Sequence, residues 1–197
     1  AGPMARTLRD AAILLGALVG TDPADGVTSS ASRFAGHDFT QYLDPAGLKG
    51  ARIGAARNYF NGPYRAKPLA EEALAAMRKA GAEVIDVEIP HKGELGKLPL
   101  EVLLYEFKHG LNRYLAQRSP APAVRTLEEL IAFNRKNREN EMPYFQQEIL
   151  EDAQERGGLD SPEYRKAVRQ TGLLSGPEGI DAVMARHKLD ALVAPAT

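Results

Sequence analysis

The chain has 197 residues, of which 44% are apolar and 26% charged, enough for one folded domain with a core. Its net charge of −1 offers no positive field for nucleic acid or an anionic membrane, and no apolar run reaches the roughly 20 residues of a membrane span. The lack of cysteine excludes disulfides and thiolate metal sites.

The first predicted element is a helix that starts after Thr7. The Thr7 hydroxyl can accept a hydrogen bond from the Asp10 N–H, which is typical of a capped helix start, and Gly20 is a typical stop. Apolar residues then repeat at the spacing of one helix face: Leu8, Ala11, Ala12, Leu15, Leu18 and Val19.

Residues 21–50 form an unusually long connection, rich in Asp, Pro, Gly and Ser. Asp22 and Asp25 precede Pro and Gly and are expected in turns. With Ser29 they suggest a cation site, but calcium loops need a denser set of ligands, so we disfavour it. Apolar and aromatic side chains are expected to anchor this segment on a neighbouring surface: Phe34, Phe39, Tyr42 and Leu43.

A strand–helix–strand unit is predicted next, with strands at 51–56 and 83–89. The helix between them starts near Pro68 and ends at Gly81. Such strands are nearly always parallel with a right-handed crossover. The expected buried face of the helix comprises Leu69, Ala73, Ala76, Met77 and Ala80.

Ligands of open α/β sheets bind beyond the carboxyl ends of the strands. Residues 58–60, Asn61 and Tyr64 follow the first strand, and residues 90–91 (Pro-His) follow the second. The alternative for residues 61–63 (Asn-Gly-Pro) is a plain turn, and we favour that alternative.

Residues 94–118 carry the longest helical pattern, with apolar residues on more than one stripe. This predicts burial on more than one side, and Pro99 marks either a bend or the true start. Glu106 lies between Tyr105 and Phe107. It is either a buried acid or a surface residue on the remaining polar strip, and we favour the surface.

Helices dominate the rest of the chain, and we predict a helical insertion over about 94–188. Thr126 caps one helix, Pro143 starts another and Ser161 caps a third. The charged run at 135–141 is expected to be solvated. A helix break is predicted at residues 175–179, before a third short strand at 189–194.

The residues alone indicate no catalytic centre. The serines are explained as turns and caps, and none lies in a Gly-x-Ser-x-Gly elbow, although Ser175 precedes a glycine. The four histidines are far apart in the sequence, and no phosphate-binding glycine loop is present. We expect no metal and no cofactor.

Several blocks together resemble the amidase signature family, whose members hydrolyse linear amides. Residues 2–7 read Gly-Pro-Met-Ala-Arg-Thr, residues 103–108 Leu-Leu-Tyr-Glu-Phe-Lys, and residues 176–181 Gly-Pro-Glu-Gly-Ile-Asp. Further matching blocks are residues 10–15, 44–54, 130–134 and 190–195. The set is most similar to the branch that contains bacterial peptide amidases, and it spans essentially the whole chain.

The resemblance implies a fold and a missing centre. The fold is α/β, with short parallel strands under helices as part of the amidase mixed sheet, and residues 1–197 form one segment of a larger domain. The family's lysine, bridging cis-serine and nucleophilic serine lie upstream of the block at 2–7, in a Gly- and Ser-rich region not found here. No catalytic residue is therefore assigned, and both ends are expected to be cut edges.

Within the family, this segment would shape the substrate pocket. The expected substrate-binding residues are Asn61, Tyr64, Tyr105 and Glu106. The expected partners are the remainder of the amidase chain, a small amide or peptide amide, and a second copy through an exposed apolar flank. An alternative is a stand-alone binding module without catalysis. Both the bacterial cytoplasm and the periplasm remain open.

Overall fold

The computed structural model describes residues 2–60, 66–120 and 122–195. The chain divides into two compact units, with the described residues of 1–53 and 65–84 in the first and those of 54–64 and 85–197 in the second. The boundary falls inside two strands, β1 (Arg52–Ala56) and β2 (Glu83–Val87). Among the described residues, no helix is long and apolar enough to cross a membrane.

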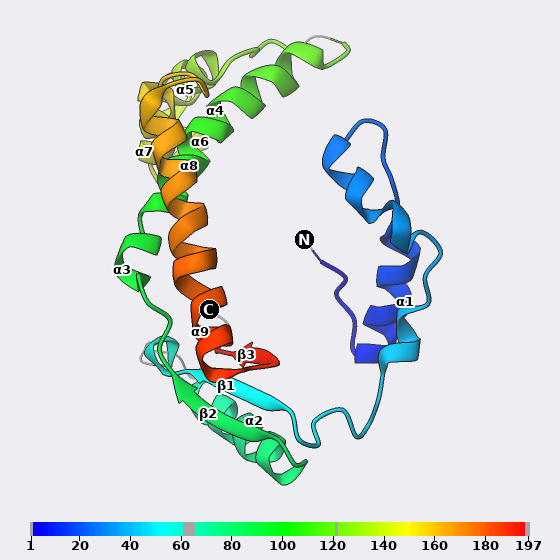
Figure 1. Cartoon of the computed structure of the whole chain (residues 1–197). Coiled ribbons are helices and arrows are strands. Elements are labelled where there is room, and N and C mark those ends of the chain that lie inside the picture. The colour runs from blue at the N-terminus through cyan, green and yellow to red at the C-terminus, as the bar shows by residue number, and fades with distance from the viewer. Residues whose placement is uncertain (1, 61–65, 121, 196–197) are drawn as a thin grey trace. The chain divides into compact units, whose positions relative to one another are not determined.

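The sheet has three parallel strands in the order β2-β1-β3 (Figure 1). These are β1 (Arg52–Ala56), β2 (Glu83–Val87) and β3 (Ala191–Val193), each within a predicted range. The predicted α/β class with short parallel strands is confirmed.

The first unit begins with helix α1 (Leu8–Leu18), whose first turn is capped as predicted by the Thr7 hydroxyl, 3.1 Å from the Asp10 nitrogen. The long connection that follows is partly ordered into 3₁₀ helices, η1 (Gly26–Phe34) and η2 (Phe39–Tyr42). Asp22 and Asp25 accept hydrogen bonds from the backbone two residues ahead of each, as turn formers do.

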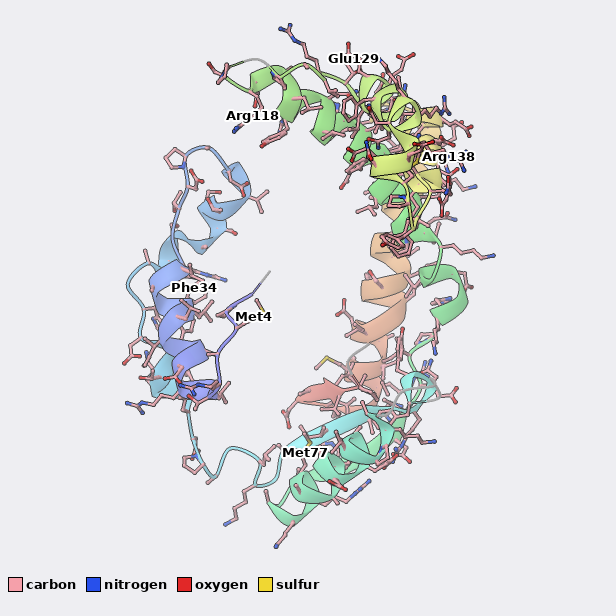
Figure 2. The ribbon with its side chains drawn as sticks, turned by 180° about the vertical axis from the view of Figure 1, so that it is seen from behind. Met4, Phe34, Met77, Arg118, Glu129 and Arg138 are labelled. Carbon is pink, nitrogen blue, oxygen red and sulfur yellow. The ribbon has the colours of Figure 1, made fainter. Side chains whose placement is uncertain are left out.

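Aromatic rings organise this connection. The ring centroids of Phe39 and Tyr42 are 5.0 and 5.5 Å from that of His37, and the centroid of Phe34 is 6.0 Å from it. Figure 2 labels Phe34 at the end of η1. Helix η2 packs on α1. The predicted anchoring thus holds for Phe39 in η2, whereas Tyr42 is 65% exposed and the rings nearest Phe34 belong to the same connection.

Helix α2 (Lys67–Lys79) has the predicted limits but a different buried face. Leu74 is its fully buried residue, whereas Leu69 is 65% exposed. The expected face of Leu69, Ala73 and Ala76 is wrong, because the helix is turned toward the stripe of Ala70, Leu74 and Met77 instead. Gly81 follows with a φ of +99°, which suits glycine at this stop.

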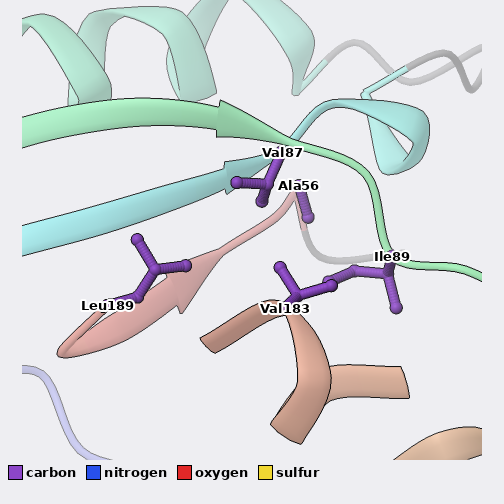
Figure 3. Close-up of a cluster of buried hydrophobic side chains, with 5 residues drawn as sticks. All are labelled: Ala56, Val87, Ile89, Val183 and Leu189. Carbon is purple, nitrogen blue, oxygen red and sulfur yellow. The ribbon is translucent and has the colours of Figure 1, made fainter. Parts of the chain in front are cut away.

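The second unit contains a cluster of buried apolar side chains beside the sheet (Figure 3). Its members are Ala56, Val87, Ile89, Val183 and Leu189. Only glycine fits at position 54 in β1. A Cβ there would lie 2.5 Å from a Leu189 methyl and 2.7 Å from a Leu192 methyl. The close approach of β1 to these leucines thus requires glycine.

The segment between β2 and β3 is helical. It contains α3 (Lys92–Leu95), α4 (Leu98–Gln117), α5 (Leu127–Lys136), α6 (Arg138–Glu141), α7 (Glu148–Glu155), α8 (Pro162–Ser175), η4 (Gly176–Ile180), a short π-helical segment, and α9 (Asp181–His187). Pro99 lies in the first turn of α4 and so marks its true start. The predicted start at Pro143 is wrong, since α7 begins at Glu148.

Helix α4 packs chiefly against α7 and α8. Leu104 forms a second buried cluster with Leu127, Ile131 and Ala153. Tyr105 is also buried and packs against Tyr164 of α8, so α4 is buried on more than one side, as predicted. Leu100, Leu103, Phe107 and Tyr114 nevertheless stay exposed. The charged run at 135–141 is solvated as predicted.

The predicted helix break occurs at η4. Gly179 has φ −109° and ψ −110°, which lies outside the helical region. A Cβ at this position would be 2.3 Å from the Leu174 carbonyl oxygen, so the kink between α8 and α9 can be made only with glycine.

Candidate functional site

A surface groove of about 530 Å³ lies among α4, the end of α7 and α8, all within the second unit. It is lined by Leu98, Glu101, Tyr105, Glu155, Arg156, Glu163, Lys166, Ala167 and Gln170. The contributions from α4 and α8 each recur at three- to four-residue spacing, so each helix presents one face to the groove.

The starts of the two long helices fix these faces. The Ser161 hydroxyl caps α8 by accepting from the Tyr164 N–H at 3.3 Å, and Pro162 occupies its first turn. Tyr105 and Ala167 are both buried, and each forms part of the groove wall. The sequence therefore positions this wall by ordinary helix capping and packing.

Arg156 at the end of α7 is held at both its side chain and its backbone. Its guanidinium donates to the Glu101 carboxylate at 2.8 and 3.0 Å, and this bond raises the pKa of Arg156. Lys108 donates to the backbone carbonyls of Gln154 and Arg156, both at 2.7 Å. The Arg156–Glu101 pair thus neutralises itself and fixes one rim of the groove.

Glu106 joins this region through Tyr164. The Tyr164 hydroxyl donates to Glu106 at 2.7 Å, and the ring centroids of Tyr164 and Tyr105 are 5.5 Å apart. The hydrogen bond to Glu106, assisted by partial burial, raises the pKa of Tyr164. Glu106 itself is exposed, so the buried-acid alternative is wrong and the surface interpretation is confirmed.

Three charged groups of the groove are available for a ligand. Within the described ranges, Lys166, Glu155 and Glu163 have no ion-pair or hydrogen-bond partner for their side chains. With the buried Tyr105 ring beside them, they offer both signs of charge next to an aromatic surface. Such a lining suits an elongated polar molecule with an apolar part.

The carboxyl ends of β1 and β2 form a second region. The Asn58 amide donates to the Ile89 carbonyl at 2.7 Å and accepts from the Ile89 N–H at 3.1 Å. Lys92 donates to the Asn58 carbonyl at 2.6 Å. Asn58 therefore links the two strand ends, and both polar atoms of its side chain are used in these hydrogen bonds.

Two smaller cavities, of about 410 and 450 Å³, lie near these strand ends and share Glu88, Val183 and Arg186. Pro90 and His91 line the larger one, as expected from their place after β2. The other two expected site residues, Asn61 and Tyr64, lie outside the described residues. In the part of the chain that the structure describes, no group of three His, Cys, Asp or Glu side chains could hold a metal ion.

The sequence reasoning missed Arg156, Tyr164 and Lys166. Lys166 could have been found from the Ser161 cap, because the cap fixes the start of α8 and hence the face that Glu163, Lys166 and Ala167 share. Tyr164 lies off this face and contacts Tyr105 and Glu106 of α4, which the cap does not predict. Arg156 pairs with a residue 55 positions away, for which the sequence carries no local signal.

A family model described as Amidase matches residues 1–197. The chain belongs to the amidase family. The native peptide amidase from Stenotrophomonas maltophilia is 44% identical in sequence, with a TM-score of 0.87 over 100% of this chain and 40% of its own. An amidase family protein from Bacillus anthracis is 31% identical, with a TM-score of 0.81 over 97% of this chain and 37% of its own.

A probable amidase of Arabidopsis thaliana is 34% identical over 98% of this chain and 37% of its own length. The chain thus spans about two fifths of the relatives it matches. The predicted resemblance to the amidase signature family and to its peptide amidases is confirmed, as is the amidase-signature α/β fold.

Proposed function

We propose that this chain forms a substrate-binding wall of an amidase that hydrolyses linear amides, with peptide amides as the substrate class. The observation that carries the proposal is the match of the whole chain to a peptide amidase at 44% identity and a TM-score of 0.87. Because the chain spans 40% of that neighbour, the activity proposed is that of an assembled domain of which this chain is one part.

The groove among α4, α7 and α8 supports a peptide-like ligand. Tyr105 would contact an apolar side chain or the peptide plane, and Tyr164 supports it from behind, with ring centroids 5.5 Å apart. Lys166 would attract a carboxylate of the ligand, and Glu155 and Glu163 a cationic group. Glu106 holds the Tyr164 hydroxyl at 2.7 Å and is proposed as a positioning residue. Asn61 and Tyr64 remain proposed contacts of the same wall.

The bond-breaking groups are proposed to lie in the portion of the domain that this chain lacks. By the resemblance, a serine would attack the amide carbonyl while a bridging serine and a lysine relay its proton. Ammonia or an amine would leave, and water would then hydrolyse the acyl-enzyme. Backbone N–H groups would stabilise the oxyanion. None of these steps is assigned to a residue of this chain.

The test combines this chain with the complementary part of the Stenotrophomonas enzyme, meaning the portion of it without a counterpart here. Ammonia release from a C-terminally amidated peptide is measured. We expect release from the mixture and none from either part alone. Lys166→Ala and Tyr164→Phe should each raise KM at least threefold. Arg169→Gln, on α8 outside the groove, should change KM less than 1.5-fold.

The stand-alone binding module makes the opposite prediction. It predicts that the chain alone binds an amidated peptide, and that adding the complementary part yields no hydrolysis. That pair of results would replace the amidase proposal with the binding module.

A further inference from the structure

Helix α4 carries an exposed apolar stripe that its neighbours in this chain leave uncovered. The stripe consists of Leu100, Leu103, Phe107 and Tyr114, which are 48%, 57%, 39% and 55% exposed. Their spacing of three, four and seven residues places them on one face of the helix. We propose that this stripe is the docking surface for the part of the amidase domain that this chain lacks.

The stripe lies beside the face of α4 that is already packed. Leu104 belongs to the buried cluster formed with α5 and α7, and the partly buried Leu111 packs against that cluster; each lies one helical turn or less from a stripe residue. Apolar residues therefore cover two adjacent faces of α4, but only one of them has a partner within the described residues. A helix with apolar residues on two faces is typical of one packed on both sides.

The side of α4 opposite the stripe carries exposed polar residues. His109 and Arg113 lie there, near the buried Tyr105. A contiguous exposed apolar patch is typical of a contact surface.

The occupant follows from the comparison with known amidases. The solved peptide amidase contains this chain's fold within a longer chain, of which this chain spans 40%. Most of that neighbour's residues thus have no counterpart here, and residues of this kind are the occupant we propose for the stripe.

A second copy of this chain is less well supported. Four side chains that are about half exposed supply on the order of 400 Å² from each copy, whereas standard interfaces bury about 800 Å² per partner. A stripe-to-stripe dimer would therefore be weak. The inference rests on the proposed function only in naming an amidase segment as the partner.

The test measures binding of the complementary part of the Stenotrophomonas enzyme to this chain by sedimentation. Leu103→Gln with Phe107→Gln should raise the dissociation constant at least tenfold. The matched control, His109→Gln with Arg113→Gln on the polar side of α4, should change it less than twofold. Both pairs are exposed, so far-ultraviolet circular dichroism should match the unaltered chain.

A second measurement uses the absence of cysteine from the sequence. A thiol introduced by Leu103→Cys should react with a thiol reagent at least tenfold more slowly when the complementary part is added or fused to the chain. The Arg113→Cys thiol should be slowed less than twofold. Equal protection at both sites, or no protection at Leu103→Cys, would overturn the proposal. So would a protected thiol in a dimer of the chain alone.

The two proposals can fail separately. Stripe-dependent binding without ammonia release would remove the proposed function and leave the docking surface in place. Ammonia release that is equally efficient with the Leu103→Gln, Phe107→Gln variant at limiting concentration would remove the docking surface and leave the function in place.

Discussion

Helix α1 and the cluster beside the sheet use apolar residues in opposite ways. Helix α1 has a capped start and a regular apolar face, yet none of its residues is buried, and Leu8 and Leu18 are 74% and 66% exposed. In the sheet cluster, by contrast, Val183 and Leu189 are 4% and 8% exposed. Large apolar side chains are thus buried in the sheet cluster and exposed to solvent on α1.

The difference separates what a helix needs to form from what it needs to be buried. A capping hydroxyl and helical periodicity are local, and both operate in α1. Burial requires a second surface, which Leu189 has and Leu18 lacks within the described residues. Leu8 and Leu18 of α1, like the stripe on α4, therefore mark apolar surface that the described residues leave uncovered.

The largest expected effect is the loss of a buried leucine. Leu189→Ala should lower the free energy of unfolding by about 2–4 kcal/mol, because it removes buried methyl groups and leaves a cavity. Leu18→Ala should change it by less than about 0.5 kcal/mol, because the side chain is already solvated. Urea denaturation followed by circular dichroism measures both. Equal losses would break the comparison.

Two glycine-to-alanine substitutions extend this comparison to steric fit, one beside the buried cluster and one at a position with open space. Gly54→Ala would place a Cβ 2.5 Å from a Leu189 methyl, so the unfolding free energy should fall by about 1–3 kcal/mol. Gly172→Ala in α8 meets nothing within 4 Å and should raise it by about 0.5–1 kcal/mol. A neutral Gly54→Ala variant would show that the cluster is looser than described.

Two helix caps of the same geometry test whether the effect of a cap on the unfolding free energy depends on the burial of the helix that it starts. Thr7 caps α1 and Thr126 caps α5, each with an N–H···O distance of 3.1 Å. Thr126→Ala should lower the unfolding free energy by about 1 kcal/mol, since Leu127 behind it is fully buried. Thr7→Ala should leave that value unchanged and instead speed amide hydrogen exchange within α1. A global loss from Thr7→Ala would contradict the comparison.

The smallest expected effect concerns an exposed polar contact. The hydrogen bond to Glu106 raises the pKa of Tyr164, so the neutral phenol is favoured in the folded chain. Its contribution to stability is complete below the ordinary tyrosine pKa near 10 and is lost as the pH rises through the raised value. Glu106→Gln should lower the pKa of Tyr164.

The measurement is the tyrosinate absorbance during an alkaline titration, taken as the difference from Tyr164→Phe. Glu128→Gln, which removes a carboxylate on α5, should leave the titration of Tyr164 unchanged. A Tyr164 curve that does not move in Glu106→Gln would exclude the hydrogen bond as the cause of the shift.

Local signals in the sequence were sufficient to predict where several helices begin and end, but not which of their faces are packed. The caps at Thr7, Thr126 and Ser161 and the stops near Gly81 and Gly179 fix helix limits through neighbouring residues, so they could be predicted. The buried face of α2 could not, because Leu69 and Leu74 are equally apolar and only the packing partner distinguishes them.

In the candidate site, too, single residues could be predicted from the sequence, but their contacts could not. Tyr105 was predicted from a family block, and it does line the groove among α4, α7 and α8. Its partner Tyr164 lies 59 positions away, and the Arg156–Glu101 pair spans 55. Contacts at such separations depend on how α4, α7 and α8 pack, and no periodicity within one helix specifies that packing.

The most direct test of the central claim is the rate of ammonia release from an amidated peptide by this chain with and without the complementary amidase part. The account predicts release only when both parts are present. Ammonia release by the chain alone, abolished by Ser175→Ala, would contradict it, because a nucleophile would then lie within these 197 residues.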